Sequence, residues 1–260
     1  MKRFGKLVKK THCLFARKEG VWGALPFSEK LSFTENMKKR VLPYFTLFVR
    51  GSEVERLDGF VVEVKERCEK LEELGKLLYR VMRELSRYEE GSMESILWRD
   101  VSSKLWSFQF GGVKLFVSSF GECYSSKHSR FGFGITKKRS YFLFQPESSF
   151  SRNSIPTHSN PNSIRHKIRL NFTKHGRPYL VSPINAREFL KGIPSTNIAN
   201  CSTRECGNKE RANGEDEEKE EFFDWWKLEK GKFQDQDYFL PQQENNLKGE
   251  KEETEKEGKW

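Results

Sequence analysis

One stretch of the chain, Trp106 to Phe150, sets the strongest limit on its fold. The first part of this stretch, Trp106 to Phe120, is rich in aromatic and β-branched residues and is interrupted by Gly111-Gly112. Two adjacent glycines suit the positive φ angles of a two-residue hairpin turn. We therefore predict two antiparallel strands here, followed by a third strand that ends at Gln145-Pro146.

The turn between the second and third predicted strands gathers side chains that could form a site. Cys123, Tyr124, Lys127, His128 and Arg130 lie within eight residues. A soft ligand, an imidazole and a guanidinium held together beside a sheet are the groups that a site needs. A polar loop that covers an aromatic sheet explains the same residues equally well.

Helical patterns precede this sheet. Ser32-Phe33-Thr34-Glu35 is a capping box and predicts a helix to about Arg50, with a kink or an early end at Pro43. Lys65 to Tyr88 has apolar residues at three- and four-residue spacing, which predicts an amphipathic helix with Cys68 facing the core.

Shorter elements complete the prediction. Leu57 to Val64 contains an apolar run after the turn-prone Asp58-Gly59, and this run is a candidate buried strand. Thr11 to Phe27 is expected to be a short strand or irregular. Ile164 to Thr173 is predicted to be a short helix. The fold class is therefore α+β, with an antiparallel or mixed sheet covered by helices.

Length and composition limit the number of domains. The chain has 260 residues, 35% of them apolar, but its mean hydropathy of -0.77 and 32% charged residues indicate that part of it does not pack. We expect a basic extension over residues 1–10 and a single domain over 11–240. Within that domain, 201–221 is an acidic low-complexity insert, and 241–260 is a disordered charged tail.

Cysteine usage and hydropathy indicate the compartment. The five cysteines are odd in number and scattered, and the N-terminus has no apolar run long enough for a signal peptide or a membrane span. We therefore expect a cytoplasmic protein with reduced thiols and no membrane partner.

The charge distribution permits an anionic partner. The formal net charge is +10, and Ser151 to Arg187 contains no acidic residue but carries His158, His166 and His175. Such a segment could contact phosphates or heme carboxylates, or its basic face could simply be solvated. With the interleaved aromatic residues it leaves a nucleic-acid-binding or interaction protein as the alternative function, although the acidic run Glu215 to Glu221 would repel a phosphate backbone.

Six short motifs occur in a characteristic order. They are Thr11-His12-Cys13-Leu14-Phe15-Ala16-Arg17-Lys18, Val21-Trp22-Gly23, Leu31-Ser32-Phe33 with Glu35-Asn36-Met37, Leu57-Asp58-Gly59-Phe60, His128-Ser129-Arg130 and Phe144-Gln145-Pro146. Their order and spacing are similar to those of the YqcI/YcgG family. A closing segment follows in Arg165-x-x-x-Arg169, Ser182-Pro183 and Trp226 to Leu240, stretched by the insertion from Cys201 to Glu221.

The resemblance implies a reaction class. Members of that family with assigned chemistry are heme-dependent N-oxygenases that act on amino or guanidino nitrogen, including arginine-like substrates. By resemblance, this chain is expected to be a monooxygenase that binds heme b, a small cationic amino-acid-like substrate and O2. An external reductase would have to supply the two electrons, because nothing in the sequence resembles a flavin or nicotinamide site.

The resemblance also suggests which residues would hold the heme. His128 is the first candidate for the iron ligand because it lies in the turn beside Arg130, with Cys123 as the thiolate alternative and His12 as the second imidazole. Arg130 and Arg169 are candidates to pair with the heme propionates, since a guanidinium fork matches a carboxylate. An exposed polar histidine is the other interpretation of His128.

A cationic substrate would require a carboxylate, because a positive group leaves water only when it is paired. Asp58 and Glu63 are the acids in otherwise apolar surroundings, so they are the candidates for this role. Asp58 could instead be a turn residue that hydrogen-bonds its own backbone.

Overall fold

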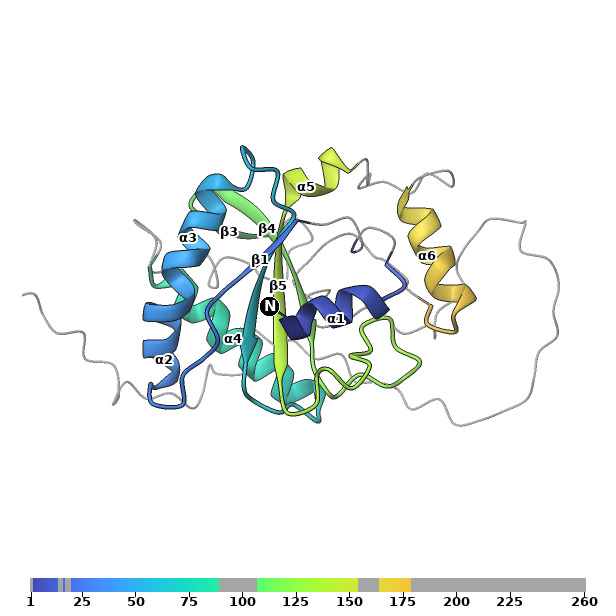
Figure 1. Ribbon diagram of the computed structural model, residues 1–260, viewed down its shortest axis with the longest axis horizontal. Helices are drawn as coiled ribbons and strands as arrows, with labels where there is room; N and C mark the ends of the chain where they lie inside the picture. Colours follow the sequence, from blue (N-terminus) through green and yellow to red (C-terminus); the bar gives the residue numbers. More distant parts are fainter. Residues whose placement is uncertain (1, 14–15, 17–19, 89–106, 154–163, 179–260) are drawn as a thin grey trace, which may run out of the picture. The chain divides into compact units, whose positions relative to one another are not determined.

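Five strands form a mixed sheet in the order β1-β2-β5-β4-β3 in the computed structural model, which describes residues 2–13, 16, 20–88, 107–153 and 164–178. β1 (Val21–Gly23) runs parallel to β2 (Gly59–Val64), and the remaining neighbours are antiparallel. Helices pack on the sheet (Figure 1). The predicted α+β class is confirmed.

The hairpin and the third strand form as predicted. β3 (Phe108–Phe110) pairs with β4 (Val113–Phe120), and the turn residues Gly111 and Gly112 have φ angles of +55° and +76°. β5 (Ser140–Pro146) pairs with both β4 and β2, and all seven of its residues are buried. The central position of β5 explains its nearly continuous apolar sequence.

The predicted helix after Ser32 forms in three parts. The capping box starts α2 (Phe33–Asn36), a π-helical turn, η2 (Met37–Val41), follows, and α3 (Leu42–Gly51) continues. In the π turn the Leu42 amide donates to the carbonyl of Met37, five residues back. The irregularity that Pro43 predicts therefore appears as a widened turn just before it, because proline restricts the residue that precedes it.

The helix predicted from Lys65 begins later. α4 covers Leu71–Ser86, so the prediction is wrong for residues 65–70. Ser140 Oγ donates to the Glu66 carbonyl and lies 3.3 Å from Cys68 Sγ, which ties this segment to the start of β5. The Glu73 carboxylate accepts the amide of Lys70 and so caps the later start. Cys68 is buried in the core as expected.

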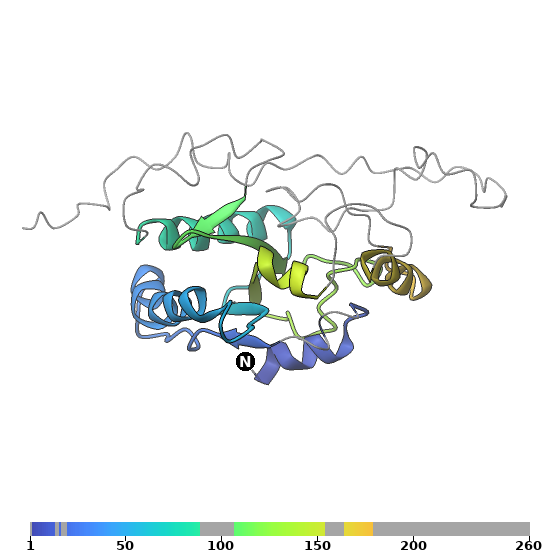
Figure 2. The same ribbon diagram turned by 90° about the horizontal axis from the view of Figure 1, so that it is seen from above.

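One face of the sheet packs against α3 and α4. The apolar residues of this core include Phe45 and Phe48 from α3, Leu78 from α4, and Phe60 and Phe144 from the sheet. The ring centroids of Phe45 and Phe144 are 5.0 Å apart at a T-shaped angle. Seen from above in Figure 2, α4 and α1 lie on opposite sides of the strands.

The opposite face is covered by a helix that the sequence did not predict. Residues 2–10, expected to be a loose basic extension, form α1 (Lys2–Lys10). Phe4 and Leu7 of α1 are buried against Val61, Tyr141 and Leu143 of the sheet. Burial of these two residues stabilises a helix whose other side chains are mostly cationic.

Two further helices follow β5. α5 (Glu147–Arg152) starts directly after Pro146, and α6 (Ile164–Lys174) agrees with the predicted helix. Ile168 and Phe172 of α6 are buried and pack against Cys13 and Phe150. The predicted insert and tail, residues 201–221 and 241–260, lie outside the described residues.

No helix among the described residues is long and apolar enough to cross a membrane.

Candidate functional site

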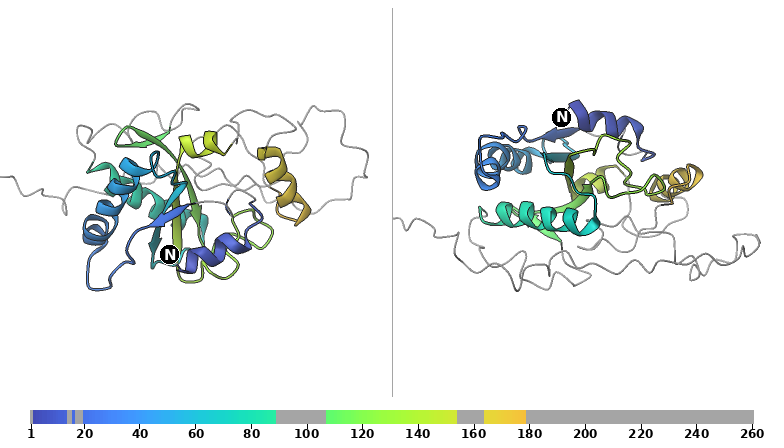
Figure 3. Two further views of the ribbon diagram at one scale, coloured as in Figure 1. Left: turned by 45° about the horizontal axis from the view of Figure 1, so that its top comes forward. Right: turned by 90° about the horizontal axis from the view of Figure 1, so that it is seen from below.

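The loop between β4 and β5, residues 121–139, lies at one end of the sheet and carries the predicted site residues Cys123, His128 and Arg130 (Figure 3). Asp58 precedes β2 and lies at the other end, because Phe60 pairs with Phe144 and Val64 pairs with Ser140. Seven residues of β5 separate the two ends, which corresponds to about 20 Å of strand. The structure therefore does not bring Asp58 together with the loop.

The Asp58 carboxylate binds groups of its own chain. Oδ2 accepts the Gly20 amide at 3.2 Å, and Oδ1 accepts Ser149 Oγ at 2.7 Å. Oδ1 also accepts Asn153 Nδ2 at 3.1 Å and Arg152 Nη2 at 3.3 Å. These contacts join β1, β2 and α5, and they account for the burial of Asp58 without a ligand. Its role in binding a substrate stays a prediction.

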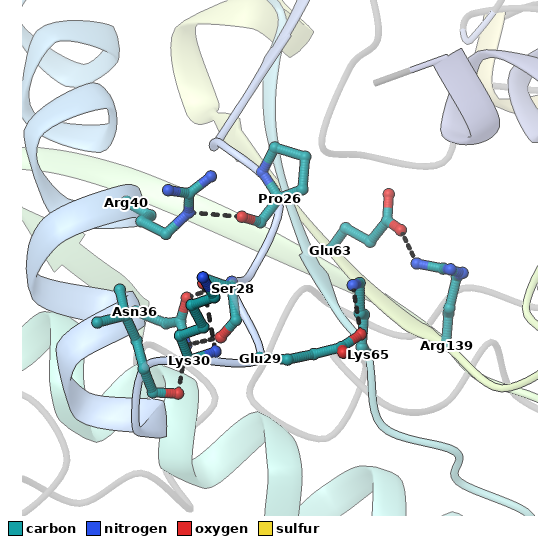
Figure 4. Close-up of polar contacts among 10 residues, drawn as sticks. Pro26, Ser28, Glu29, Lys30, Asn36, Arg40, Glu63, Lys65 and Arg139 are labelled. Atoms are coloured by element: carbon teal, nitrogen blue, oxygen red, sulfur yellow. Dashed lines mark hydrogen bonds and ion pairs between the residues drawn. The ribbon is translucent and has the colours of Figure 1, made fainter.

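Glu63 lies on the α1 side of the sheet and forms an ion pair with Arg139 (Figure 4). Glu63 is 15% exposed and Arg139 is 20% exposed, so the pair is largely shielded from water. Beside it, Lys65 pairs with Glu29 at 2.9 Å on the surface. A cationic substrate would have to displace Arg139 before it could bind Glu63.

Within the loop, three predicted residues come together. Tyr124 and His128 stack with ring centroids 4.4 Å apart, and the Arg130 side chain hydrogen-bonds Tyr124. Arg130 is only 3% exposed, and burial raises the pKa of Tyr124. His128 Nδ1 accepts the amide of Arg130 at 3.0 Å. The adjacent Ser129 hydroxyl is buried and lacks a hydrogen-bond partner among the described residues.

Cys123, next to Tyr124 in the chain, is partly buried and packs against the main core. This core includes Cys68 and Leu74. Burial raises the pKa of the Cys123 thiol to about 12, so the thiol is protonated at neutral pH. This is the opposite of the lowered pKa of a thiolate ligand.

A second cluster forms where three distant segments meet. His12 stacks on His175, with ring centroids 3.8 Å apart and 14° between the planes. Arg177 Nη1 lies 3.1 Å from His12 Nδ1, and its guanidinium lies over the rings of Phe133 and Phe131, at 4.7 Å and 5.4 Å from their centroids. This cluster therefore combines residues of the N-terminal segment, of the 121–139 loop and of the segment that follows α6. It places a guanidinium over two phenylalanine rings, next to two stacked imidazoles.

Hydrogen bonds fix this second cluster. Asn171 Nδ2 donates to the His12 carbonyl at 2.6 Å, and the Asn171 carbonyl lies 2.7 Å from His175 Nδ1. Arg177 Nε donates to the Ser126 carbonyl at 2.7 Å. Phe133 has a φ angle of +52°, a left-handed conformation that is unusual for a bulky residue. Strained residues that the surrounding structure holds in place are typical of functional sites.

Arg169, the other predicted propionate partner, lies on α6 next to Ile168, two residues before Asn171. It therefore belongs to the element that supplies the second cluster. The structure brings His12 into this cluster. His128 and Arg130 instead lie with Tyr124 in the other group of side chains, within the 121–139 loop. No group of three or more His, Cys, Asp or Glu side chains suitable for a metal ion occurs in the described part of the chain.

The sequence did not predict that His175, Arg177 and Asn171 form one site with His12. The acid-free basic segment indicated that this region could contact an anion, but no motif connects it with His12. Arg177 and His12 are 165 residues apart in the sequence, so their contact depends on the fold.

Comparison with known protein families matches the sequence of this chain to one of them. The model of the YqcI/YcgG family matches residues 9–178, which include the 121–139 loop, His12 and α6. The match covers more than half of the chain, and the chain belongs to the YqcI/YcgG family. No curated protein and no solved structure shows a significant match.

Proposed function

We propose that this YqcI/YcgG protein is a heme-dependent N-oxygenase that hydroxylates an amino or guanidino nitrogen of a small amino-acid-like substrate. The family relationship supports this reaction class, as expected from the sequence. The observation that carries the proposal is the second cluster, in which the Arg177 guanidinium lies over the rings of Phe131 and Phe133 and beside the stacked imidazoles of His12 and His175.

The chemistry of this donor set fits heme b. A heme needs a nitrogen ligand for its iron, cationic partners for its two propionates and apolar contacts for its ring. The cluster offers two imidazoles, the Arg177 guanidinium and the rings of Phe131 and Phe133. Arg130 and Arg169 are further candidates for the propionates, because guanidinium groups bind carboxylates bidentately.

The proposed reaction uses one molecule of O2 and two electrons from an external reductase. One oxygen atom forms an N–OH bond in place of an N–H bond of the substrate, and the other leaves as water after taking up two protons. When bound, heme would supply the activation of O2. The chain itself would hold the substrate nitrogen close to that centre and restrict the access of water.

The carboxylates that could bind the cationic group of the substrate already form ion pairs within the chain. Asp58 and Glu63 were predicted for this task, but Arg152 contacts Asp58 and Arg139 contacts Glu63. Either acid would bind substrate only after exchanging an arginine for the substrate cation. The aromatic rings of Phe131 and Phe133 already hold one guanidinium, and they could hold another by the same cation–π attraction.

The reaction can be tested by isotope transfer. The full chain is loaded with heme and incubated under ¹⁸O2 with an electron-donating ferredoxin system and either L-arginine or other amino acids with basic side chains. We expect a product that carries one ¹⁸O atom on nitrogen, formed only when heme, reductant and O2 are all present. Heme-loaded protein that reduces O2 without transferring ¹⁸O to any of these amines would contradict the proposal.

A further inference from the structure

We propose that His175 Nε2 is the axial ligand of the heme iron. This inference rests on the heme proposal above and replaces His128, the residue that the sequence favoured. It follows from the position of the proton on each imidazole, which determines which ring nitrogen has a lone pair for a metal.

His175 has the hydrogen bond that a ligating histidine needs. Its Nδ1 lies 2.7 Å from the backbone carbonyl oxygen of Asn171. A carbonyl oxygen can only accept, so Nδ1 must carry the proton and donate it. In the neutral ring the lone pair is then on Nε2. Histidines bound to metals typically donate their other N–H to a backbone carbonyl or a carboxylate in this way.

His128 and His12 have the opposite arrangement. His128 Nδ1 accepts the backbone amide of Arg130 at 3.0 Å. His12 Nδ1 lies 3.1 Å from Arg177 Nη1, and a guanidinium can only donate. In both neutral rings the lone pair of Nδ1 is used and the proton is on Nε2. Neither ring therefore presents an Nε2 lone pair in this orientation.

The neighbours of His175 hold its imidazole ring in one orientation, as is typical of a histidine that binds a metal. Its ring stacks on His12, and the two planes differ by 14°. Asn171 connects both histidines. Its backbone carbonyl accepts a hydrogen bond from His175 Nδ1, and its side-chain amide donates one to the His12 carbonyl. His175 is an exposed residue, as an imidazole that binds a group from outside the chain has to be.

Variants at two histidines test the assignment. Hemin is titrated into the full wild-type chain, His175→Gln and the matched control His128→Gln, and the Soret band is followed in the ferric and the ferrous carbon monoxide states. Glutamine keeps an N–H for the Asn171 carbonyl but cannot replace the imidazole as ligand. We expect His175→Gln to bind hemin at least ~10-fold more weakly and with a shifted Soret band, and His128→Gln to behave as wild type.

Rescue separates ligation from a structural effect. Free imidazole should restore the wild-type Soret band in His175→Gly, because it can occupy the space of the missing ring. Unchanged hemin affinity and spectra in both His175 variants would overturn the assignment while leaving the proposed function intact. Absence of a saturable Soret band in wild type would instead overturn the proposed function and the assignment with it.

A measurement on the wild-type chain avoids any dependence on variant folding. Diethyl pyrocarbonate modifies unligated imidazoles, and the modified sites are identified by mass spectrometry. We expect bound heme to protect His175 and to leave the reactivity of His128 unchanged. Equal modification of His175 with and without heme would contradict its role as ligand.

Discussion

Asp58 connects three segments of the chain through one carboxylate. The carboxylate accepts hydrogen bonds from the Gly20 amide, just before β1, and from Ser149 and Arg152 of α5. It also accepts one from Asn153, the residue after α5. Asp58 is only 7% exposed. Its position in a turn with otherwise apolar surroundings made it a candidate for substrate binding, but the same burial arises when a carboxylate joins neighbouring elements.

The structural role of Asp58 predicts a large loss of stability. Asp58→Ala leaves the Arg152 guanidinium and three neutral donors without their acceptor, so we expect the free energy of unfolding to fall by about 3 kcal/mol. Urea denaturation provides the measurement. Glu29→Ala, which removes an exposed partner of Lys65, is the control and should leave the midpoint unchanged. An Asp58→Ala protein with normal stability but no substrate binding would support the original substrate role instead.

The thiols of buried Cys68 and half-buried Cys123 give a second prediction. Burial raises their pKa values to about 11 and about 12, so both are protonated near neutral pH. Alkylation by iodoacetamide at pH 8 should be at least ~10-fold slower in the folded chain than in urea, because the thiolate is the reacting form. Rapid alkylation of folded Cys123 would restore it as a candidate thiolate ligand.

The same two thiols affect how stability depends on pH. Each binds its proton more tightly in the folded state than in the unfolded state, where a thiol has a pKa of about 8.5. Their contribution to stability is therefore complete below that pH and is lost as the pH rises toward 11 and 12. The urea midpoint should fall between pH 8 and pH 10.5, and the fall should be smaller in Cys68→Ala/Cys123→Ala. A midpoint that rises over this range would contradict the direction of both shifts.

Among the elements, α1 is the one whose packing was least expected. Most of α1 precedes residue 9, where the family match begins, yet Phe4 and Leu7 cover one face of the sheet. The Phe4 ring lies 5.5 Å from that of Tyr141 and 5.7 Å from that of Phe120. The helix is therefore a structural part of this chain rather than a separate extension.

Truncating the apolar side of α1 should destabilise the whole unit. Phe4→Ala removes a side chain that is 2% exposed, and we expect it to lower the free energy of unfolding by about 3 kcal/mol. Lys6→Ala in the same helix keeps both apolar contacts and should change it by less than ~0.5 kcal/mol. Thermal unfolding compares the two variants. Equal stability of Phe4→Ala and wild type would show that α1 does not pack on the sheet in solution.

The elements also show what sequence patterns can predict. The hairpin was predictable because Gly111-Gly112 and the flanking aromatics act over neighbouring residues. α1 was not, since its apolar residues are few and the sheet that buries them comes later in the chain. The same reasoning applies to the candidate site: the loop residues His128 and Arg130 were found by proximity in the sequence, whereas the contact of His12 with His175 exists only in the folded chain.

For the molecule as a whole, the net charge of +10 keeps an anionic partner as the alternative function. The exposed side of α1 carries Lys2, Arg3, Lys6, Lys9 and Lys10. Binding of this surface to an oligonucleotide would weaken steeply with salt, because it would depend on phosphate contacts. Such binding would not explain why imidazole and guanidinium groups converge at the end of α6.

The most direct measurement is the absorption spectrum of the purified full chain during titration with hemin, recorded oxidised and then reduced under carbon monoxide. We expect a Soret band that saturates at one heme per chain and a carbon monoxide spectrum typical of an imidazole ligand. Absorbance that rises without saturation, as for unbound hemin, would contradict the proposed heme enzyme, and a thiolate-type carbon monoxide spectrum would contradict the assignment of His175.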